Sequence, residues 1–268
     1  RYDNLLAGHG IGWLKDRATA ITPEDSKLHT AGGKELNYSR LVVATGAAPF
    51  SFGVPGVETY AQTFRTLADV DRLAALIKKI KQQPQSLQRI AVVGAGPSGV
   101  ELACKLADLL KGSAVVELLE RGPQCLANAK AFNRQQALLA LQRLDVRLRC
   151  NCEVLSVGAH ELQLKQEGSE TPEQLKIAAV IWTAGQQSKP PCPQLPQQQN
   201  GKLQCLANLQ VQDFPEIFGI GDGAFVPHDP PLPASAQVAF QQAPILARNL
   251  MRSLAAEPLE DFVWRDLG

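Results

Sequence analysis

Near its middle the sequence runs Ile90-Ala91-Val92-Val93-Gly94-Ala95-Gly96-Pro97-Ser98-Gly99. The first four residues are a short apolar run bounded by turn residues, which predicts a parallel strand covered on both faces. The next six fit the pattern G-x-G-x-x-G, and apolar residues then recur at helical spacing from Pro97 to about Lys111. A strand, a glycine-rich turn and a helix in this order are typical of a β-α-β unit that binds a dinucleotide.

Each glycine of the turn has a separate expected task. Gly94 permits the tight turn, Gly96 lets the backbone approach a pyrophosphate, and Gly99 lets the helix lie close to the strand. Pro97 and Ser98 open the helix, whose first amides supply donors and positive potential to phosphates. We therefore expect residues 94–99 to bind the phosphates of a nucleotide.

A carboxylate completes this pattern at the end of the second predicted strand, Val115–Glu120. Glu120 follows the turn at about the distance where an acidic residue binds a ribose 2′-hydroxyl. Its charge disfavours a 2′-phosphate, whereas the neighbouring Arg121 could pair with one. NADH is the favoured nucleotide, and NADPH stays open.

Composition favours small-molecule chemistry over a polyanionic partner. The chain has 268 residues and a net charge of +1, without the run of Lys and Arg that nucleic-acid binding requires. Six cysteines form no C-x-x-C pair and no metal-ligand spacing with the four histidines, so we expect reduced thiols and no metal site. No apolar run is long enough to cross a bilayer.

The remaining chain alternates predicted strands and helices, which indicates an α/β protein. We expect strands at 17–21, 27–30, 41–44, 146–148 and 180–182, two strands within 154–164, and helices at 67–81 and 134–143. A Pro- and Gly-rich segment at 49–56 predicts a linker. Residues 186–204 are rich in Pro and Gln and predict an exposed loop.

Three more segments of the sequence contain motifs at strand ends. They are Leu41-Val42-Val43-Ala44-Thr45-Gly46-Ala47-Ala48-Pro49, Val180-Ile181-Trp182-Thr183-Ala184-Gly185, and Pro215-Glu216-Ile217-Phe218-Gly219-Ile220-Gly221-Asp222. Together with the turn at 94–99, they resemble the flavoprotein family with two dinucleotide-binding domains, one for FAD and an inserted one for NAD(P)H. The resemblance implies that Thr45, Gly46 and Gly185 lie where the chain crosses between the domains. It also implies that Gly221 and Asp222 contact FAD, the aspartate through the flavin ribitol.

A narrower resemblance concerns Ala236-Gln237-Val238-Ala239-Phe240-Gln241-Gln242. This segment is similar to the A-Q-x-A-x-Q-Q segment of type II NAD(P)H:quinone oxidoreductases, which lies under the flavin and lines the quinone pocket. Phe262–Gly268 resembles the strand that follows, and Ala131–Arg134 points to the cyanobacterial and plastid branch.

This resemblance implies specific roles for four residues. Gln237 and Val238 would contact FAD, Gln241 would face the quinone, and Glu101 would face the nicotinamide and flavin. A solvated surface position is the alternative for Gln241, and a structural role is the alternative for Glu101.

The resemblance also implies an arrangement of two Rossmann-like three-layer domains. An NAD(P)H domain at 86–205 would be inserted in a partial FAD domain made of 1–85 and 206–268. An upstream FAD fingerprint and a C-terminal membrane-binding region are expected outside this sequence. The protein would act peripherally on the cytoplasmic face of a thylakoid or plasma membrane, with a homodimer as one expected state.

The implied reaction passes two electrons from NAD(P)H through FAD to a membrane quinone, with the nicotinamide stacked on the flavin. Two alternatives stay open. One is another flavoprotein reductase of the superfamily, acting on a ferredoxin or a disulfide. The other is a truncated nucleotide-binding module without flavin.

Overall fold

The structure is a computed structural model that describes residues 5–82 and 88–266. The chain forms two compact units, which are described separately. The first contains residues 1–48 and 187–268, and the second contains residues 49–186. The short strands β5 (Ala48–Pro49) and β14 (Gln186–Gln187) stand where the chain passes from one unit to the other.

The second unit is built on a five-stranded parallel sheet with the order β6-β13-β7-β8-β9. Its strands, in that order, are Ala61–Gln62, Ala179–Trp182, Gln88–Val93, Ala114–Leu119 and Arg147–Arg149. The longer helices of this unit are α3 (Leu67–Lys81), α4 (Pro97–Leu109) and α5 (Ala131–Arg143). The predicted β-α-β unit is confirmed, with its bounds within one or two residues.

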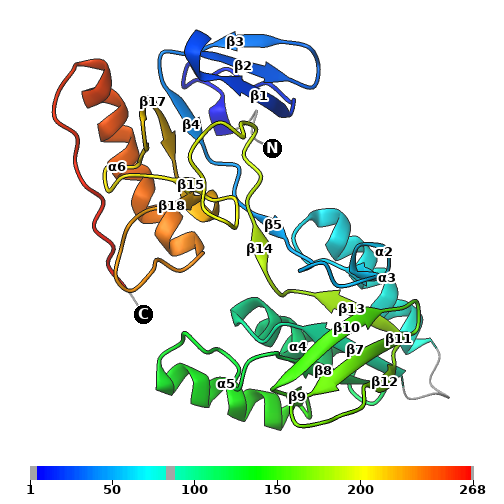
Figure 1. The fold of residues 1–268 in the computed structure, drawn as a ribbon. Coiled ribbons are helices and arrows are strands. Elements are labelled where there is room, and N and C mark those ends of the chain that lie inside the picture. Colours follow the sequence, from blue (N-terminus) through cyan, green and yellow to red (C-terminus); the bar gives the residue numbers. More distant parts are fainter. Residues whose placement is uncertain (1–4, 83–87, 267–268) are drawn as a thin grey trace. The chain divides into compact units, whose positions relative to one another are not determined.

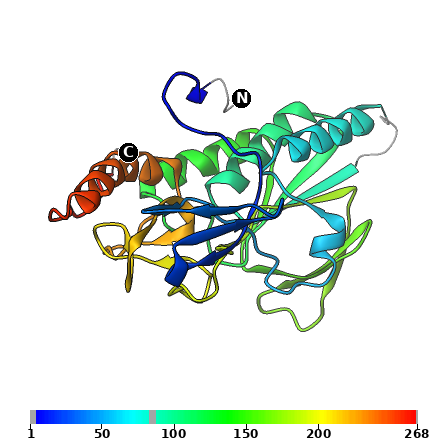
Figure 2. The ribbon, with the colours of Figure 1, turned by 90° about the horizontal axis from the view of Figure 1, so that it is seen from above.

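The central strand β7 is buried on both faces because its side chains alternate. Ile90 and Val92 pack with the apolar faces of the helices. Ala91 and Val93 pack instead against an antiparallel sheet formed by β10 (Cys152–Val157), β11 (Glu161–Gln166) and β12 (Glu173–Lys176). Helices, parallel sheet and antiparallel sheet make three layers, and Figure 2 shows the cyan and green helices along one side of the strands.

The first unit contains two three-stranded sheets and a long helix. One sheet is antiparallel, with β1 (Ala18–Thr22), β2 (Lys27–Thr30) and β3 (Glu35–Asn37). The other has the order β16-β17-β4, from Gln210–Val211, Phe214–Gly219 and Leu41–Val43. The helix α6 (Ala236–Leu254) runs alongside β17 (Figure 1). A two-stranded pair, β15 (Leu203–Gln204) and β18 (Ala224–Phe225), completes this unit.

The bounds of these compact units differ from the predicted domain bounds. Helix α3 belongs to the second unit because Leu73 and Ile80 pack in the same core as β7. Residues 187–205 belong to the first unit because Cys192, Leu195 and Cys205 pack in its core. The assignment of the units to FAD and NAD(P)H stays a prediction.

Two local expectations need correction. The segment 186–204 is not an exposed loop, because Ser188, Cys192 and Leu195 are almost fully buried. The predicted linker, by contrast, has no helix or strand from residue 50 to residue 56. It leads into α2 (Val57–Tyr60), and Val157 N–H donates to the carbonyl of Pro55 at 2.9 Å.

The second correction concerns the predicted strand at 262–268. Residues 262–266 form no strand, since Phe262 N–H bonds instead to the Ala207 carbonyl at 2.8 Å. Residues 267–268 of that prediction lie outside the described residues.

Candidate functional site

The turn after β7 is so tight that two of its glycines have no room for a side chain. Gly94 has a φ of +98°, and a Cβ built on it would lie 2.9 Å from the backbone of Ala184. A Cβ on Gly99 would lie 1.8 Å from the carbonyl oxygen of Gly94. The first turn of α4 therefore lies directly against the end of β7, as the sequence pattern predicts.

Gly96 differs, because a Cβ at this position would meet open space, with no protein atom within 4 Å. Gly96 is the N-cap of α4 and supplies no capping side chain, and Pro97 and Ser98 after it are exposed. The first N–H groups of a helix need partners from outside the helix, and they attract anions. The start of α4 thus offers an open place for a phosphate group.

The Glu120 carboxylate connects the end of β8 to the turn that follows β7. One oxygen of its carboxylate accepts the N–H of Ala95 at 2.7 Å, and the other accepts the N–H of Gly122 at 2.8 Å. An ionised carboxylate has about four acceptor positions, so these two bonds leave capacity for hydroxyl groups of a ligand. The side chain is half-buried beside the turn.

A threonine fixes the turn from the other side. The Thr183 hydroxyl donates to the carbonyl oxygens of Val93 and Gly94, at 2.8 and 3.0 Å respectively. Sequence reasoning identified the crossing at 183–185 but gave this hydroxyl no task. The pairing joins residues some ninety positions apart, so local pattern could not reveal it.

These strand ends surround one cavity of about 380 Å³. Its walls come from the segments that follow β13, β7 and β8, together with residues of β10 and the loop before α2. The lining residues are Phe52, Val54, Val93, Gly94, Gly96, Leu119, Glu120, Arg121, Cys152, Glu153, Val154, Trp182, Thr183, Ala184 and Gly185. Four predicted site residues therefore line one cavity: Gly94, Gly96, Glu120 and Gly185.

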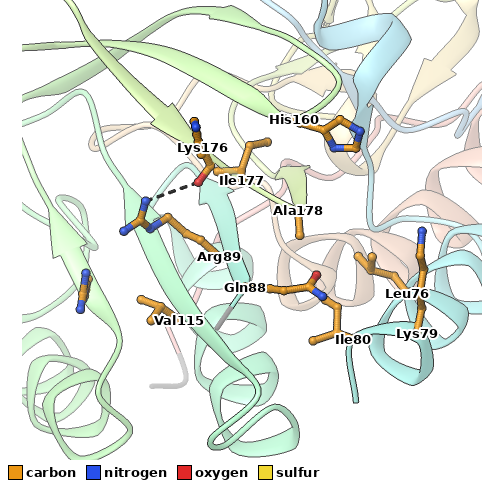
Figure 3. A pocket seen from close by; sticks show the side chains of 11 residues that line it. Leu76, Lys79, Ile80, Gln88, Arg89, Val115, His160, Lys176, Ile177 and Ala178 are labelled. Atoms are coloured by element: carbon orange, nitrogen blue, oxygen red, sulfur yellow. Dashed lines mark hydrogen bonds between the residues drawn. The ribbon is translucent and has the colours of Figure 1, made fainter. Parts of the chain in front are cut away.

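A second cavity of about 580 Å³ lies at the opposite ends of the parallel strands. Figure 3 shows its lining, where Gln88 and Arg89 begin β7 and the Arg89 guanidinium donates to the Lys176 carbonyl at 3.4 Å. In open parallel sheets, ligands bind outside the carboxyl ends of the strands. We therefore take the smaller cavity, at the carboxyl ends, as the candidate site.

Other predicted residues of this unit lie outside the cavity lining. Pro97 and Ser98 stand at the exposed start of α4, and Gly99 is buried against the turn. Glu101 is exposed on α4 and is not among the lining residues. Its predicted role toward nicotinamide and flavin stays a prediction.

The first unit brings its predicted residues to the ends of another parallel strand pair. Thr45 and Gly46 follow β4, and Gly221 and Asp222 follow β17, whose register pairs Gly219 with Val43. The Ser188 hydroxyl donates to the Gly46 carbonyl at 3.1 Å. A Cβ on Gly223 would lie 2.9 Å from that same oxygen, so the two turns lie directly against each other.

Helix α6 holds the second of these turns through a buried amide. The Gln242 side chain is 1% exposed, and its oxygen accepts the N–H of Gly221 at 2.8 Å. Ser235 caps the helix by accepting the N–H of Val238 at 3.3 Å. A solvated side chain, the ordinary expectation for a glutamine on a helix, is therefore wrong for Gln242, and its position in the A-Q-x-A-x-Q-Q segment is the sequence signal for a role.

The residues predicted to contact flavin or quinone on α6 lie in different environments. Gln241 exchanges two hydrogen bonds with the backbone of Arg265, at 2.8 and 3.1 Å. The Val238 side chain packs in the core, whereas Gln237 is half-buried.

All six cysteines are free thiols, and burial makes five of them poor nucleophiles. It raises the pKa of Cys205 to about 12. Burial also raises the thiol pKa of Cys104, Cys125, Cys150 and Cys152. Thiolates, not thiols, attack disulfides, so these residues do not suit thiol chemistry. The described residues also contain no group of three His, Cys, Asp or Glu side chains placed to hold a metal ion.

A parallel sheet with a glycine turn, an open helix start and a carboxylate at adjacent strand ends defines a Rossmann-like dinucleotide-binding protein. The family comparison is more specific. The chain belongs to the pyridine nucleotide-disulphide oxidoreductase family, whose model matches residues 2–243.

Two relatives and one solved structure illustrate the likeness. Demethylphylloquinone reductase NdbB of Synechocystis sp. is 33% identical over 273 residues, which cover 98% of this chain and 67% of that protein. The alternative NAD(P)H-ubiquinone oxidoreductase C1 of Arabidopsis thaliana, chloroplastic/mitochondrial, is 29% identical, with 100% of this chain and 58% of that protein covered. The structure of sulfide:quinone oxidoreductase from Aquifex aeolicus matches with a TM-score of 0.80 at 17% identity, covering 94% of this chain and 63% of that one.

These comparisons confirm the predicted family and the α/β fold. The chain spans roughly three fifths to two thirds of the length of the two curated relatives. The described ranges contain no helix with the length and apolar character of a membrane span.

Proposed function

We propose that this chain forms the nucleotide-binding core of a FAD-dependent NAD(P)H:quinone oxidoreductase. The observation that carries the proposal is the cavity bounded by Gly96, Glu120 and Gly185, in a family of pyridine nucleotide oxidoreductases. Both curated relatives described above are named as reductases of a quinone.

The second unit suits NAD(P)H. Its pyrophosphate would bind the open start of α4 beside Gly96, where a missing Cβ leaves room for close approach. Glu120 would accept a ribose hydroxyl with the lone pairs that Ala95 and Gly122 leave free. Gly185 would border the far end of the nucleotide. The nucleotide-binding role predicted for residues 86–205 is thus proposed for the second unit, residues 49–186.

The first unit suits part of a FAD site. Thr45, Gly46, Gly221 and Asp222 meet at adjacent strand ends, and glycines at the contact bring the two turns within reach of one ligand. When bound, FAD would accept a hydride from the reduced nicotinamide and deliver two electrons to the quinone. The chain's own residues would bind and orient the reactants, with Gln237 and Val238 beside the flavin and Glu101 toward the nicotinamide.

Gln241 is proposed to lie on the quinone side. Its amide is fixed by the Arg265 backbone, so a quinone would meet a side chain already held in one orientation. We further propose that the complete protein binds the cytoplasmic face of a membrane as a peripheral protein, in a plasma or thylakoid membrane, and that it forms a homodimer.

Electron transfer by the purified protein tests the proposal. A yellow protein that passes electrons from NADH to a short-chain quinone supports it. A colourless protein that binds NADH without turnover favours the nucleotide-binding module. Turnover with a ferredoxin or a disulfide in place of the quinone favours another reductase of the superfamily and overturns the quinone assignment.

A further inference from the structure

Phe52 occupies a backbone conformation that a bulky residue rarely adopts. Its φ is +53°, the next residue Gly53 has a φ of +73°, and Val54 N–H bonds to the Ser51 carbonyl at 3.0 Å. Two central residues with positive φ, closed by this bond, match a type I′ turn, which favours Asn-Gly or Gly-Gly. Phenylalanine therefore strains the turn.

Burial does not compensate for the strain, because half of the Phe52 surface remains exposed. The ring is nevertheless held from two sides. A Cβ on Gly185 would lie 2.4 Å from the Phe52 ring, so the ring rests where only glycine leaves space. The ring also meets Phe50 edge-on at 4.8 Å, and the Trp182 indole fixes the Phe50 carbonyl at 2.9 Å.

The exposed ring of Phe52 contacts the positively charged side chain of Arg121. The guanidinium carbon of Arg121 lies 5.8 Å from the centre of the Phe52 ring, within the range of a cation–π contact. Both residues line the nucleotide cavity. Arg121 brings the sole formal positive charge among the residues that line this cavity, and Glu120 and Glu153 contribute carboxylates to the same lining.

A dinucleotide brings at least two negative charges to this cavity, and the carboxylates that line the cavity repel these charges. Arginine binds phosphate well because its planar donors match the phosphate oxygens. A long arginine side chain loses rotamer freedom on binding, and a surface that orients it beforehand lowers this loss. Backbone strain at a residue whose side chain remains exposed is typical of a functional position.

We propose that Phe52 is a positioning residue that holds Arg121 ready to bind a phosphate group of NAD(P)H. The proposal rests on the function proposed above and adds two residues to its nucleotide site. The phosphate is either the pyrophosphate, which NADH and NADPH share, or the 2′-phosphate of NADPH. The two nucleotides distinguish these cases, because an effect confined to NADPH indicates the 2′-phosphate.

Phe52→Asn gives a sharp test, because asparagine suits a left-handed turn position better than phenylalanine does. The melting temperature should hold or rise, while the dissociation constant for NADH or NADPH, from nucleotide fluorescence, should rise about three- to tenfold. Phe132→Asn is the matched control. Phe132 is 69% exposed in the same unit and does not line the cavity, so this change should leave binding unaltered.

A double-mutant cycle with Arg121→Gln decides whether the two residues act together. Arg121→Gln should weaken binding by a similar factor, and Phe52→Asn should add little in that background. Additive effects, or Phe52→Asn binding as tightly as the original chain, would overturn the proposal. If the unaltered protein binds neither nucleotide, the proposed function itself fails, which separates the two results.

Discussion

The carboxylate of Glu120 accepts the N–H of Ala95 at 2.7 Å, and so joins the end of β8 to the turn after β7. The residue expected to select the ribose thus also helps to hold the phosphate-binding turn. Changes at Glu120 should therefore affect nucleotide choice and stability together.

Glu120→Gln should increase the use of NADPH relative to NADH. It removes a negative charge from the position where a 2′-phosphate would lie, which corresponds to about 1 to 2 kcal/mol near a protein surface, or roughly tenfold. The ratio of kcat/KM for the two nucleotides measures this shift. Glu170→Gln, an exposed position outside the cavity lining, is the control, and an equal ratio in both variants would contradict the prediction.

Two alanine substitutions in one turn should separate binding from stability. Gly96→Ala places a methyl group in open space at an ordinary φ of −71°, so the free energy of unfolding should change by less than about 0.5 kcal/mol. NADH affinity should fall about tenfold or more, because the methyl group takes the place where the pyrophosphate approaches.

Gly99→Ala should mainly reduce stability, because its Cβ would collide with the Gly94 carbonyl. A loss of about 3 kcal/mol in the free energy of unfolding is expected. Urea unfolding and NADH titration measure both quantities. Similar behaviour of the two variants would show that the turn is not built as described.

Gln242→Leu should destabilise the first unit. It leaves the partly buried Gly221 N–H without its acceptor, which costs about 1 to 3 kcal/mol. Because Gly221 begins the turn predicted to contact FAD, flavin absorbance per protein should fall as well. Gln241→Leu is the neighbouring control, with a half-buried side chain and an expected loss of about 1 kcal/mol or less. Equal losses would contradict the prediction.

Asp69 should make stability depend on pH in acid. It forms a capping box with Thr66 at the start of α3, and the Arg72 guanidinium donates to it. Burial alone would raise its pKa, but hydrogen bonds from the backbone N–H groups of Arg65 and Thr66 outweigh burial and lower the pKa to about 2. The folded pKa lies below the unfolded value of 3.8, so this stabilisation is present above that pH and is lost as pH falls toward 2.

Asp69→Ala should therefore cost about 1 to 2 kcal/mol at neutral pH and progressively less between pH 4 and pH 2. Urea unfolding at several pH values measures the difference. Asp71→Ala, an exposed position on the same helix, is the control. A difference that stays constant with pH would exclude this role for Asp69.

Sequence reasoning predicted the second unit well because its signals are local. The apolar run of β7, the glycine turn and the helix that follows agree with each other over about twenty residues. Predictions were wrong where partners lie far away in sequence. Cys192 and Leu195 sit in a Pro- and Gln-rich segment, yet they fill the core beside β4 and β17.

The site shows the same division. Gly94, Gly96 and Glu120 follow from the pattern, whereas the Thr183 hydroxyl acts on a strand some ninety residues away. Phe52 could not be predicted, since its conformation contradicts the preference of its residue type. Its position depends on Gly185, which leaves the space that the ring occupies.

The burial of β7 on both faces also limits how nucleotide preference can change. Any polar substitution from Ile90 to Val92 would place an unpaired group between two packed layers, so this part of the strand cannot take part in selecting a ligand. Selectivity can instead vary at Phe52 and Arg121, which border the cavity, and at Glu120, where a change also affects the turn that its carboxylate holds. An engineer could therefore change the preferred electron donor at these three positions while leaving the buried residues of β7 unchanged.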